Sequence, residues 1–133
     1  MKRNKPIVDW IQFDSNEEVE VYVALKEKKL HILTWIEELK KFKLVNARPN
    51  ATLLCEGFKA WDKVIRKRVY THDFDILNWK EEIMLEVKSK WTEAKPDYRL
   101  RRFLFLFFNY NTKKFAELIK VKKWVWKYIK YFK

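Results

Sequence analysis

The chain has 133 residues, of which 48% are hydrophobic and 17% aromatic, and this is enough for a single domain with a modest core. Thirty Lys and Arg residues against eighteen Asp and Glu residues give a formal net charge of +12, which favours a polyanionic partner, nucleic acid ahead of an anionic membrane surface. A single glycine excludes glycine-rich phosphate-binding loops, and a single cysteine, Cys55, excludes disulfide frameworks and cysteine-based zinc sites.

The first predicted elements are an N-terminal arm, residues 1–12, and a helix over about residues 15–28. Apolar residues follow Glu18 at helical spacing, which places Glu18 on the buried side of this helix. Two roles are open for it. Ser15 and Glu18 have the spacing of a capping box, in which the Glu18 carboxylate accepts a hydrogen bond from the Ser15 amide. A carboxylate on the buried side could equally be a ligand for a metal ion or a water molecule.

The middle of the chain is predicted to add one helix and a pair of strands. Apolar residues at helical spacing indicate an inserted helix over residues 30–44. Residues 52–60 and 64–77 are then expected to form two antiparallel strands joined at 61–63. Three basic residues, 66–68, lie on the second of these strands. They would form either a solvated strand face or an edge that contacts phosphates.

A second hairpin carries the most informative residues. Residues 70–77 and 83–90 are predicted to form two strands that pair across 78–82. Side chains alternate faces along a strand, so the second strand would turn one apolar set towards the core and another set the opposite way. The core-facing set is Ile83, Leu85 and Val87, and the opposite set is Met84, Glu86 and Lys88.

The charged residues of this hairpin indicate chemistry. A carboxylate and an ammonium group, those of Glu86 and Lys88, cost stability on an otherwise hydrophobic strand unless they are paired or bind an ion. Asp73, on the neighbouring strand, can supply a second carboxylate to the same face. Two acids beside a lysine suit a divalent metal with oxygen ligands and a cation next to the attacking water. The alternative for Glu86 and Lys88 is an ordinary cross-strand ion pair on an exposed sheet face.

A helix is predicted over residues 96–110. Pro96 suits its first turn, because the missing N–H would have no helical partner there. An apolar run, 103–108, fills the second half and should be buried on most sides. The arginines of the first half are Arg99, Arg101 and Arg102. They could present planar donors to DNA phosphates, or pair with acids such as Glu93 and Asp97.

The last predicted elements are a strand over residues 114–121 and a basic, aromatic helix over residues 121–133. Apolar residues share one face of that helix, which favours packing on a sheet or a second subunit over binding to a membrane surface or to unpaired bases. The longest apolar run, 103–108, is far too short to span a bilayer, and the basic residues 1–5 precede no apolar signal segment. We therefore expect an intracellular, cytoplasmic protein without membrane association.

Three segments together resemble a known group of nucleases. Asp73, followed by Glu-Val-Lys at residues 86–88, resembles the PD-(D/E)XK signature of the restriction-endonuclease-like superfamily. Residues 13–18 are similar to the segment that carries an extra metal-binding Glu in phage-type junction-resolving endonucleases. Residues 70–74 resemble their Tyr-Thr-Pro-Asp-Phe stretch. The sequence departs from the pattern at His72, where the motif usually has Pro, and the interval between the two acids is a few residues longer than in compact members.

The resemblance covers about residues 13–118 and implies an α/β fold. Its restriction-endonuclease-like αβββαβ core has a mixed central sheet flanked by helices, and residues 1–133 would form one such domain. The implied metal ligands, for Mg²⁺ or Mn²⁺, are Glu18, Asp73, Glu86 and the carbonyl of Val87. Lys88 would complete the catalytic set by orienting the attacking water or stabilising the transition state. Asp75, two residues beyond Asp73, would support that residue or replace it.

The implied activity is that of a metal-dependent endonuclease that cuts branched DNA such as Holliday junctions. Such an enzyme would act as a homodimer in the cytoplasm of a bacterium or of a phage-infected cell. The residues expected to contact DNA are Lys90, Arg99, Arg101 and Arg102. Two alternatives stay open. One is a nuclease of the same fold that acts in transposition or restriction and cuts at specific sequences, and the other is a basic protein that binds DNA without cutting it.

Overall fold

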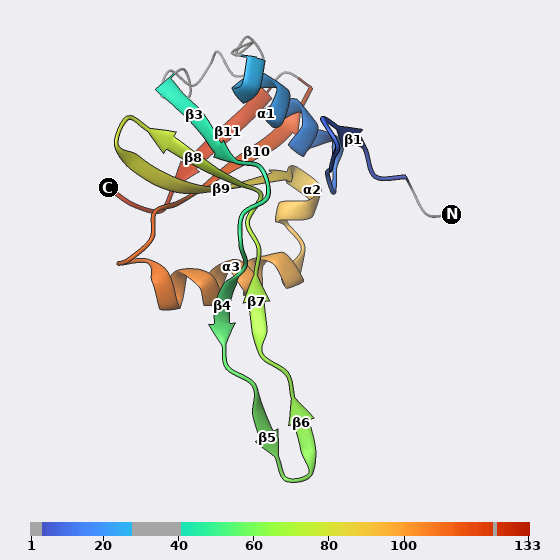
Figure 1. Ribbon diagram of the computed structural model, residues 1–133, viewed down its shortest axis with the longest axis vertical. Helices are drawn as coiled ribbons and strands as arrows, with labels where there is room; N and C mark the ends of the chain where they lie inside the picture. Colours follow the sequence, from blue (N-terminus) through green and yellow to red (C-terminus); the bar gives the residue numbers. More distant parts are fainter. Residues whose placement is uncertain (1–3, 28–40, 124) are drawn as a thin grey trace.

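The computed structural model describes residues 4–27, 41–123 and 125–133. Its central feature is a five-stranded mixed sheet with the strand order β11-β10-β9-β8-β3 (Figure 1). The strands are β3 (Phe42–Asn46), β8 (Phe74–Asn78), β9 (Glu81–Ser89), β10 (Phe115–Lys122) and β11 (Val125–Lys130). Neighbouring strands are antiparallel except for β9 and β10, which run parallel. The predicted α/β class with a mixed sheet is confirmed.

Two main helices pack on opposite faces of this sheet. They are α1 (Asn16–Glu27) and α3 (Pro96–Asn109), and a short helix, α2 (Lys90–Glu93), directly follows β9. The sheet and its main helices follow along the chain in the order α1, β3, β8, β9, α3, β10, β11. Helix α3 thus lies in the crossover that two parallel strands require. Among the residues described, no helix combines the length and the apolar character needed to cross a membrane.

The α1 side of the sheet holds the main hydrophobic core. Val21 and Leu25 of α1 pack there against the side chains that β9 turns towards the helix. Those side chains are Ile83, Leu85 and Val87, and each is at most 2% exposed. Full burial of such a side chain stabilises the fold by about 1.5–3 kcal/mol. The predicted alternation of faces along this strand is therefore confirmed.

The β8–β9 hairpin forms as predicted, with differences at its ends: its first strand, predicted over residues 70–77, begins only at Phe74. Phe74 lies opposite Leu85, and the turn is tighter than expected, because only Trp79 and Lys80 separate the two strands. Trp79 has a φ of 58°, the left-handed conformation that a two-residue hairpin turn requires. At the far end β9 stops at Ser89, whose side chain caps α2.

The α3 side of the sheet holds a second hydrophobic cluster, which is smaller and more aromatic than the main core. Tyr98 and Phe105 of α3 pack there with Tyr70 and Phe115. The opposite side of α3 is uncovered, with four apolar residues 53–64% exposed. These are Leu100, Phe103, Phe107 and Phe108. The prediction that residues 103–108 are buried on most sides is wrong, because within the described part of the chain only one side of α3 has a layer to pack against.

Between β3 and β8 the chain forms a long two-stranded arm that projects from the sheet (Figure 1). Its inner half pairs β4 (Thr52–Cys55) with β7 (Arg68–Tyr70), and its outer half pairs β5 (Phe58–Ala60) with β6 (Lys63–Ile65). The predicted antiparallel pairing is confirmed, but both strands are interrupted between the two halves, and Lys63 already belongs to β6. The second strand also ends at Tyr70, because residues 74–77 belong to β8 of the central sheet.

The only glycine of the chain lies at this interruption. A Cβ at Gly57 would come within 2.9 Å of the Ile65 carbonyl oxygen and 3.0 Å of the Lys67 nitrogen. Both neighbours are backbone atoms of the facing strand, so they cannot move aside as a flexible side chain would. Glycine is therefore required here, where the backbone of the facing strand leaves no room for a side chain.

Three predicted segments differ from the structure. Residues 42–44, predicted as the end of a helix, belong to β3, because Phe42 is buried in the core and pairs with Asn78; the rest of that helix, up to residue 40, lies outside the described residues. Residues 125–130, predicted as helical, form β11, since antiparallel pairing with β10 turns Trp126 into the core. The N-terminal arm contains a small hairpin of β1 (Ile7–Val8) and β2 (Ile11–Gln12).

Candidate active site

Three carboxylates converge where α1, β8 and β9 meet. Glu18 lies in the first turn of α1, Glu86 lies on β9, and Asp73 directly precedes β8. The antiparallel register, in which Phe74 faces Leu85, brings Asp73 next to Glu86. The Asp73 carboxyl group interacts with both Glu86 and Glu18. The structure therefore brings together the three acids that the sequence selects as metal ligands.

Glu18 is fixed by the start of its own helix. Its Oε2 atom accepts hydrogen bonds from the backbone N–H of Asp14 at 2.6 Å and of Ser15 at 3.1 Å, and the Glu18 N–H in turn donates to Ser15 Oγ at 3.3 Å. This is the capping box expected from the sequence. The cap also holds the Glu18 carboxylate against Asp73. The two roles left open for Glu18 are thus compatible in one geometry.

The other two carboxylates are also held through one oxygen each. Asp73 Oδ2 accepts a hydrogen bond from the Val87 N–H at 2.7 Å, and the Tyr70 hydroxyl donates to Glu86 Oε2. The Val87 backbone therefore lies beside the acids, while a ligand role for its carbonyl stays a prediction. Lys88 lies with Nζ 3.7 Å from Glu86 Oε1 and 5.0 Å from the centre of the Tyr98 ring.

The carboxylates outnumber the nearby cations. Burial and the neighbouring Asp73 raise the pKa of Glu18 to about 9. Burial and the adjacent Glu86 carboxylate raise the pKa of Asp73 well above its usual value. Like charges held together away from water favour protonation, or a cation that takes the place of the protons. Among the described residues, the one basic side chain that forms an ion pair with any of these three acids is Lys88, which contacts Glu86.

The donor set fits a hard divalent cation. Within the described residues, no group of three or more His, Cys, Asp or Glu side chains is arranged so that it could hold a metal ion as it stands. The chemistry is nevertheless suitable, since each of the three carboxylates accepts its hydrogen bonds from described residues outside the cluster through one oxygen, and the second oxygen of Glu86 lies 3.7 Å from Lys88 Nζ. Oxygen donors of this kind are what Mg²⁺ and Mn²⁺ prefer.

Asp75 does not join these acids. Its carboxylate contacts Nε2 of His72, a buried ring, and it lines a groove with residues of the β8–β9 turn. Burial lowers the pKa of His72 even though Asp75 opposes the shift. The His72 Nδ1 atom is buried without a hydrogen-bond partner among the described residues. The structure therefore gives Asp75 a partner of its own instead of placing it beside Asp73.

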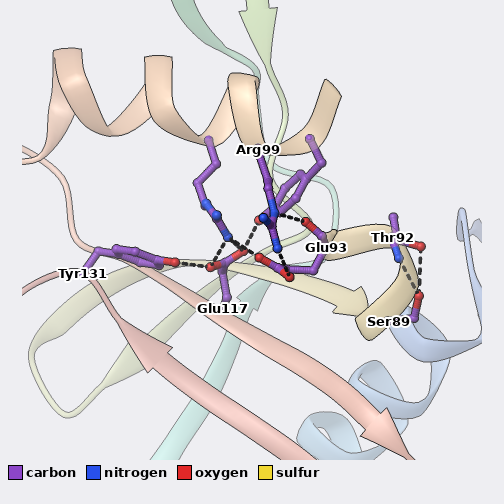
Figure 2. Close-up of polar contacts among 8 residues, drawn as sticks. Ser89, Thr92, Glu93, Arg99, Glu117 and Tyr131 are labelled. Carbon is purple, nitrogen blue, oxygen red and sulfur yellow. Dashed lines mark hydrogen bonds and ion pairs between the residues drawn. The ribbon is translucent and has the colours of Figure 1, made fainter. Parts of the chain in front are cut away.

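Another buried carboxylate, that of Glu117 on β10, was not selected from the sequence. Figure 2 shows it beside Tyr131, whose hydroxyl donates to Glu117 Oε1. Arg102 Nη1 lies 3.1 Å from both carboxylate oxygens, and the Tyr98 hydroxyl donates to Oε2. The sequence alone does not single out Glu117, because its position beside Glu86 depends on the parallel register of β9 and β10.

The residues predicted to contact DNA separate into two groups. Arg99 pairs with Glu93 at 3.3 Å (Figure 2), and Arg102 pairs with the same residue at 3.0 Å. This is the acid pairing left open as an alternative. Arg101 and Lys90 are exposed, and neither makes an ion pair with a described residue. Only the second group has its charge available for a phosphate.

Comparison of the chain with models of protein families, with curated proteins and with solved structures gives no significant match. The function proposed next therefore depends on the carboxylates, on Lys88 and on their surroundings.

Proposed function

We propose that the protein is a metal-dependent DNA endonuclease. The observation that carries the proposal is the convergence of two buried carboxylates, Glu18 and Glu86, and a partly buried one, Asp73, next to the Lys88 ammonium group. Carboxylates that crowd together with so little compensating charge are costly for a purely structural purpose. They are useful where a divalent cation binds a phosphate. The +12 net charge of the chain suits a DNA substrate.

The order of the elements supports the same proposal. Asp73, directly before β8, and Glu86, on β9, follow α1 and β3, and the crossover helix α3 and β10 come after them. This is the αβββαβ order implied by the resemblance to restriction-endonuclease-like nucleases, with β11 added at the edge. We propose that the sheet has this core, and that Asp73 and residues 86–88 are its signature.

Each residue of the site has a distinct task in this mechanism. A divalent metal, when bound, lowers the pKa of a coordinated water and offsets charge on the phosphate. Glu18, Asp73 and Glu86 would hold the metal through their second oxygens, while the hydrogen bonds from Ser15, Val87 and Tyr70 fix their orientation. Lys88 would donate to the attacking water or to the charged phosphate oxygens.

Branched DNA is the substrate class that we propose. The proposal rests on the resemblance of two segments to one group of nucleases. Residues 13–18 and 70–74 are those that resemble junction-resolving endonucleases, and they supply Glu18 and Asp73. Paired cuts on the two sides of a junction would further indicate that two copies of the chain act together.

The test compares wild type with Lys88→Ala on a labelled four-way junction and on a linear duplex of matched sequence, with Mg²⁺, with Mn²⁺ and with chelator. We expect metal-dependent, paired cuts on the junction that Lys88→Ala loses. Lys80→Ala is the matched control, since Lys80 is exposed at the opposite end of β9, and it should cut as wild type does.

Other results would change the conclusion. Cuts at fixed sequences in the linear duplex would favour the transposition or restriction alternative. DNA binding with no metal-dependent cleavage would contradict the enzyme and leave a DNA-binding protein.

A further inference from the structure

The tip of the arm exposes apolar side chains far from the core. Trp61, in the turn between β5 and β6, is 97% exposed and has a φ of 58°. Phe58 and Val64 on the adjoining strands are 60% and 76% exposed. A two-stranded ribbon has marginal stability by itself, and these largely exposed side chains add little burial to it. Exposed aromatic groups in such a place are typical of a surface that meets a partner.

The arm is also positively charged. Between residues 56 and 68 there are five basic residues and two acids, a net charge of +3 from 5 − 2. The basic residues are Lys59, Lys63, Arg66, Lys67 and Arg68, and all five are exposed. None of them makes an ion pair with the described residues. This surface is therefore complementary to a polyanion.

The root of the arm leads directly to the carboxylates. Tyr70, the last residue of β7, donates its hydroxyl hydrogen to Glu86, and Asp73 follows three residues later. Beside the root, a groove of about 580 Å³ runs between the arm and α3. It is lined by Lys67, Arg68, Val69, Leu54, Asp97, Leu100, Arg101 and Leu104. Arg101, the α3 arginine without an acid partner among the described residues, thus shares a groove with two basic residues of the arm, Lys67 and Arg68.

We propose that the arm is a DNA-binding element that grips the branch of the substrate. Its basic residues would contact phosphates along both strands of the ribbon, and Trp61 would stack on a base that is unpaired at the branch point. Stacking depends on an exposed π-face and tolerates any sequence, which suits a protein that recognises DNA structure. The inference rests on the proposed function for the identity of the substrate, but it concerns binding and not cleavage.

The test measures binding without cleavage. Fluorescence anisotropy in chelator would give the affinity of the full-length chain for a four-way junction, for linear duplex and for single-stranded DNA. Trp61→Ala should weaken junction binding at least tenfold and change duplex binding much less. The matched control is Trp79→Ala, because Trp79 is 82% exposed in another hairpin turn with the same φ of 58°.

A second variant tests the charges independently of the tryptophan. Lys59→Ala combined with Lys63→Ala should weaken binding to the junction and to the duplex by similar factors. It should also reduce the slope of log affinity against log salt by about 2, one for each lost phosphate contact. Lys43→Ala combined with Lys80→Ala removes two exposed lysines elsewhere and should leave the slope unchanged. Thermal melting would show that all four proteins are equally folded.

The outcomes separate this inference from the nuclease proposal. Arm variants that bind the junction like their controls would overturn the inference, whether or not wild type cuts DNA. If the wild type never cuts DNA, but the Trp61→Ala variant binds the junction more weakly than the wild type does, the inference is supported and the nuclease proposal is contradicted. Trp61-dependent binding to anionic lipid vesicles without binding to DNA would overturn it in favour of a membrane contact.

Discussion

The carboxylates of Glu86 and Glu117 lie side by side on β9 and β10, where the parallel register pairs the two residues directly. Both are almost completely buried, at 2% and 0% exposure. Glu117 has Arg102 within 3.1 Å of both oxygens and two tyrosine hydroxyls as donors. Glu86 has one tyrosine hydroxyl, a lysine at 3.7 Å and a second carboxyl group beside it.

This difference teaches how burial is to be interpreted. A buried charge that is paired and fully hydrogen-bonded can serve the fold alone, and Glu117 meets that description. A buried charge placed next to another of the same sign is a cost to the fold, and such sites are where function is to be sought. Residue type and exposure are the same for the two glutamates, so their partners carry the distinction.

The largest expected effect is on stability, at Glu117. Glu117→Ala removes the acceptor of Arg102, Tyr98 and Tyr131 at once, and should lower the free energy of unfolding by about 3–5 kcal/mol. Chemical denaturation measures this loss in the free energy of unfolding. Glu93→Ala, which removes the other partner of Arg102 at a more exposed position, should cost far less. Equal losses in the two variants would refute the structural role assigned to Glu117.

The second effect is on activity, at Glu86. Glu86→Gln keeps an acceptor for the Tyr70 hydroxyl and removes one negative charge from beside Asp73. Its free energy of unfolding in chelator should match or exceed that of wild type. Cleavage should fall at least about 100-fold, since even residues behind the metal ligands typically contribute 10–100-fold.

A metal titration sharpens the same contrast. Mn²⁺ should raise the melting temperature of wild type and of Glu117→Gln, because a ligand that binds only the folded state stabilises it. It should have no effect on Glu86→Gln. If Glu86→Gln still gains stability from Mn²⁺ and still cuts DNA, Glu86 is not a ligand.

The local part of this site could be predicted from the sequence. Strand alternation alone placed Glu86 and Lys88 opposite the core-facing residues of β9, and a hairpin of short span brought Asp73 beside them. Helical spacing placed Glu18 on the buried side of α1. These relations join residues in one element or in adjacent strands, so they depend on backbone periodicity and not on the rest of the fold.

The remaining features depend on contacts between distant segments. Residues 125–130 carry a helical pattern, and pairing with β10 overrides it in favour of the strand that buries Trp126. The exposed apolar side of α3 follows from its position over one sheet face, which composition does not report. Glu117 acquires its role only when β9 and β10 are in register. The periodicity of a segment does not show which other segment it will pack or pair with.

The smallest effect is a pH dependence that separates Glu18 from its neighbours. The pKa of about 9 in the folded chain exceeds the ordinary value of 4.5, so the folded state holds a proton that the unfolded chain releases. Glu18 therefore contributes fully to stability below pH 4.5, and this contribution is lost progressively as the pH rises towards 9. His72 has a lowered pKa, and its contribution is lost on the acid side of 6.5, so measurements between pH 7 and 9 avoid it.

In chelator, the free energy of unfolding of wild type should fall between pH 7 and 9, and Glu18→Gln should flatten that fall while preserving the cap, because glutamine also serves at this capping position. Glu17→Gln, in the same helical turn and only partly buried, is the matched control and should retain the wild-type slope.

Asp73 has a raised pKa as well, so a smaller slope of the same sign should remain in Glu18→Gln. Mn²⁺ should reduce the slope in wild type, because the metal takes the place of the protons as the pH rises. A slope that Glu18→Gln leaves unchanged would show that Glu18 serves the helix cap alone.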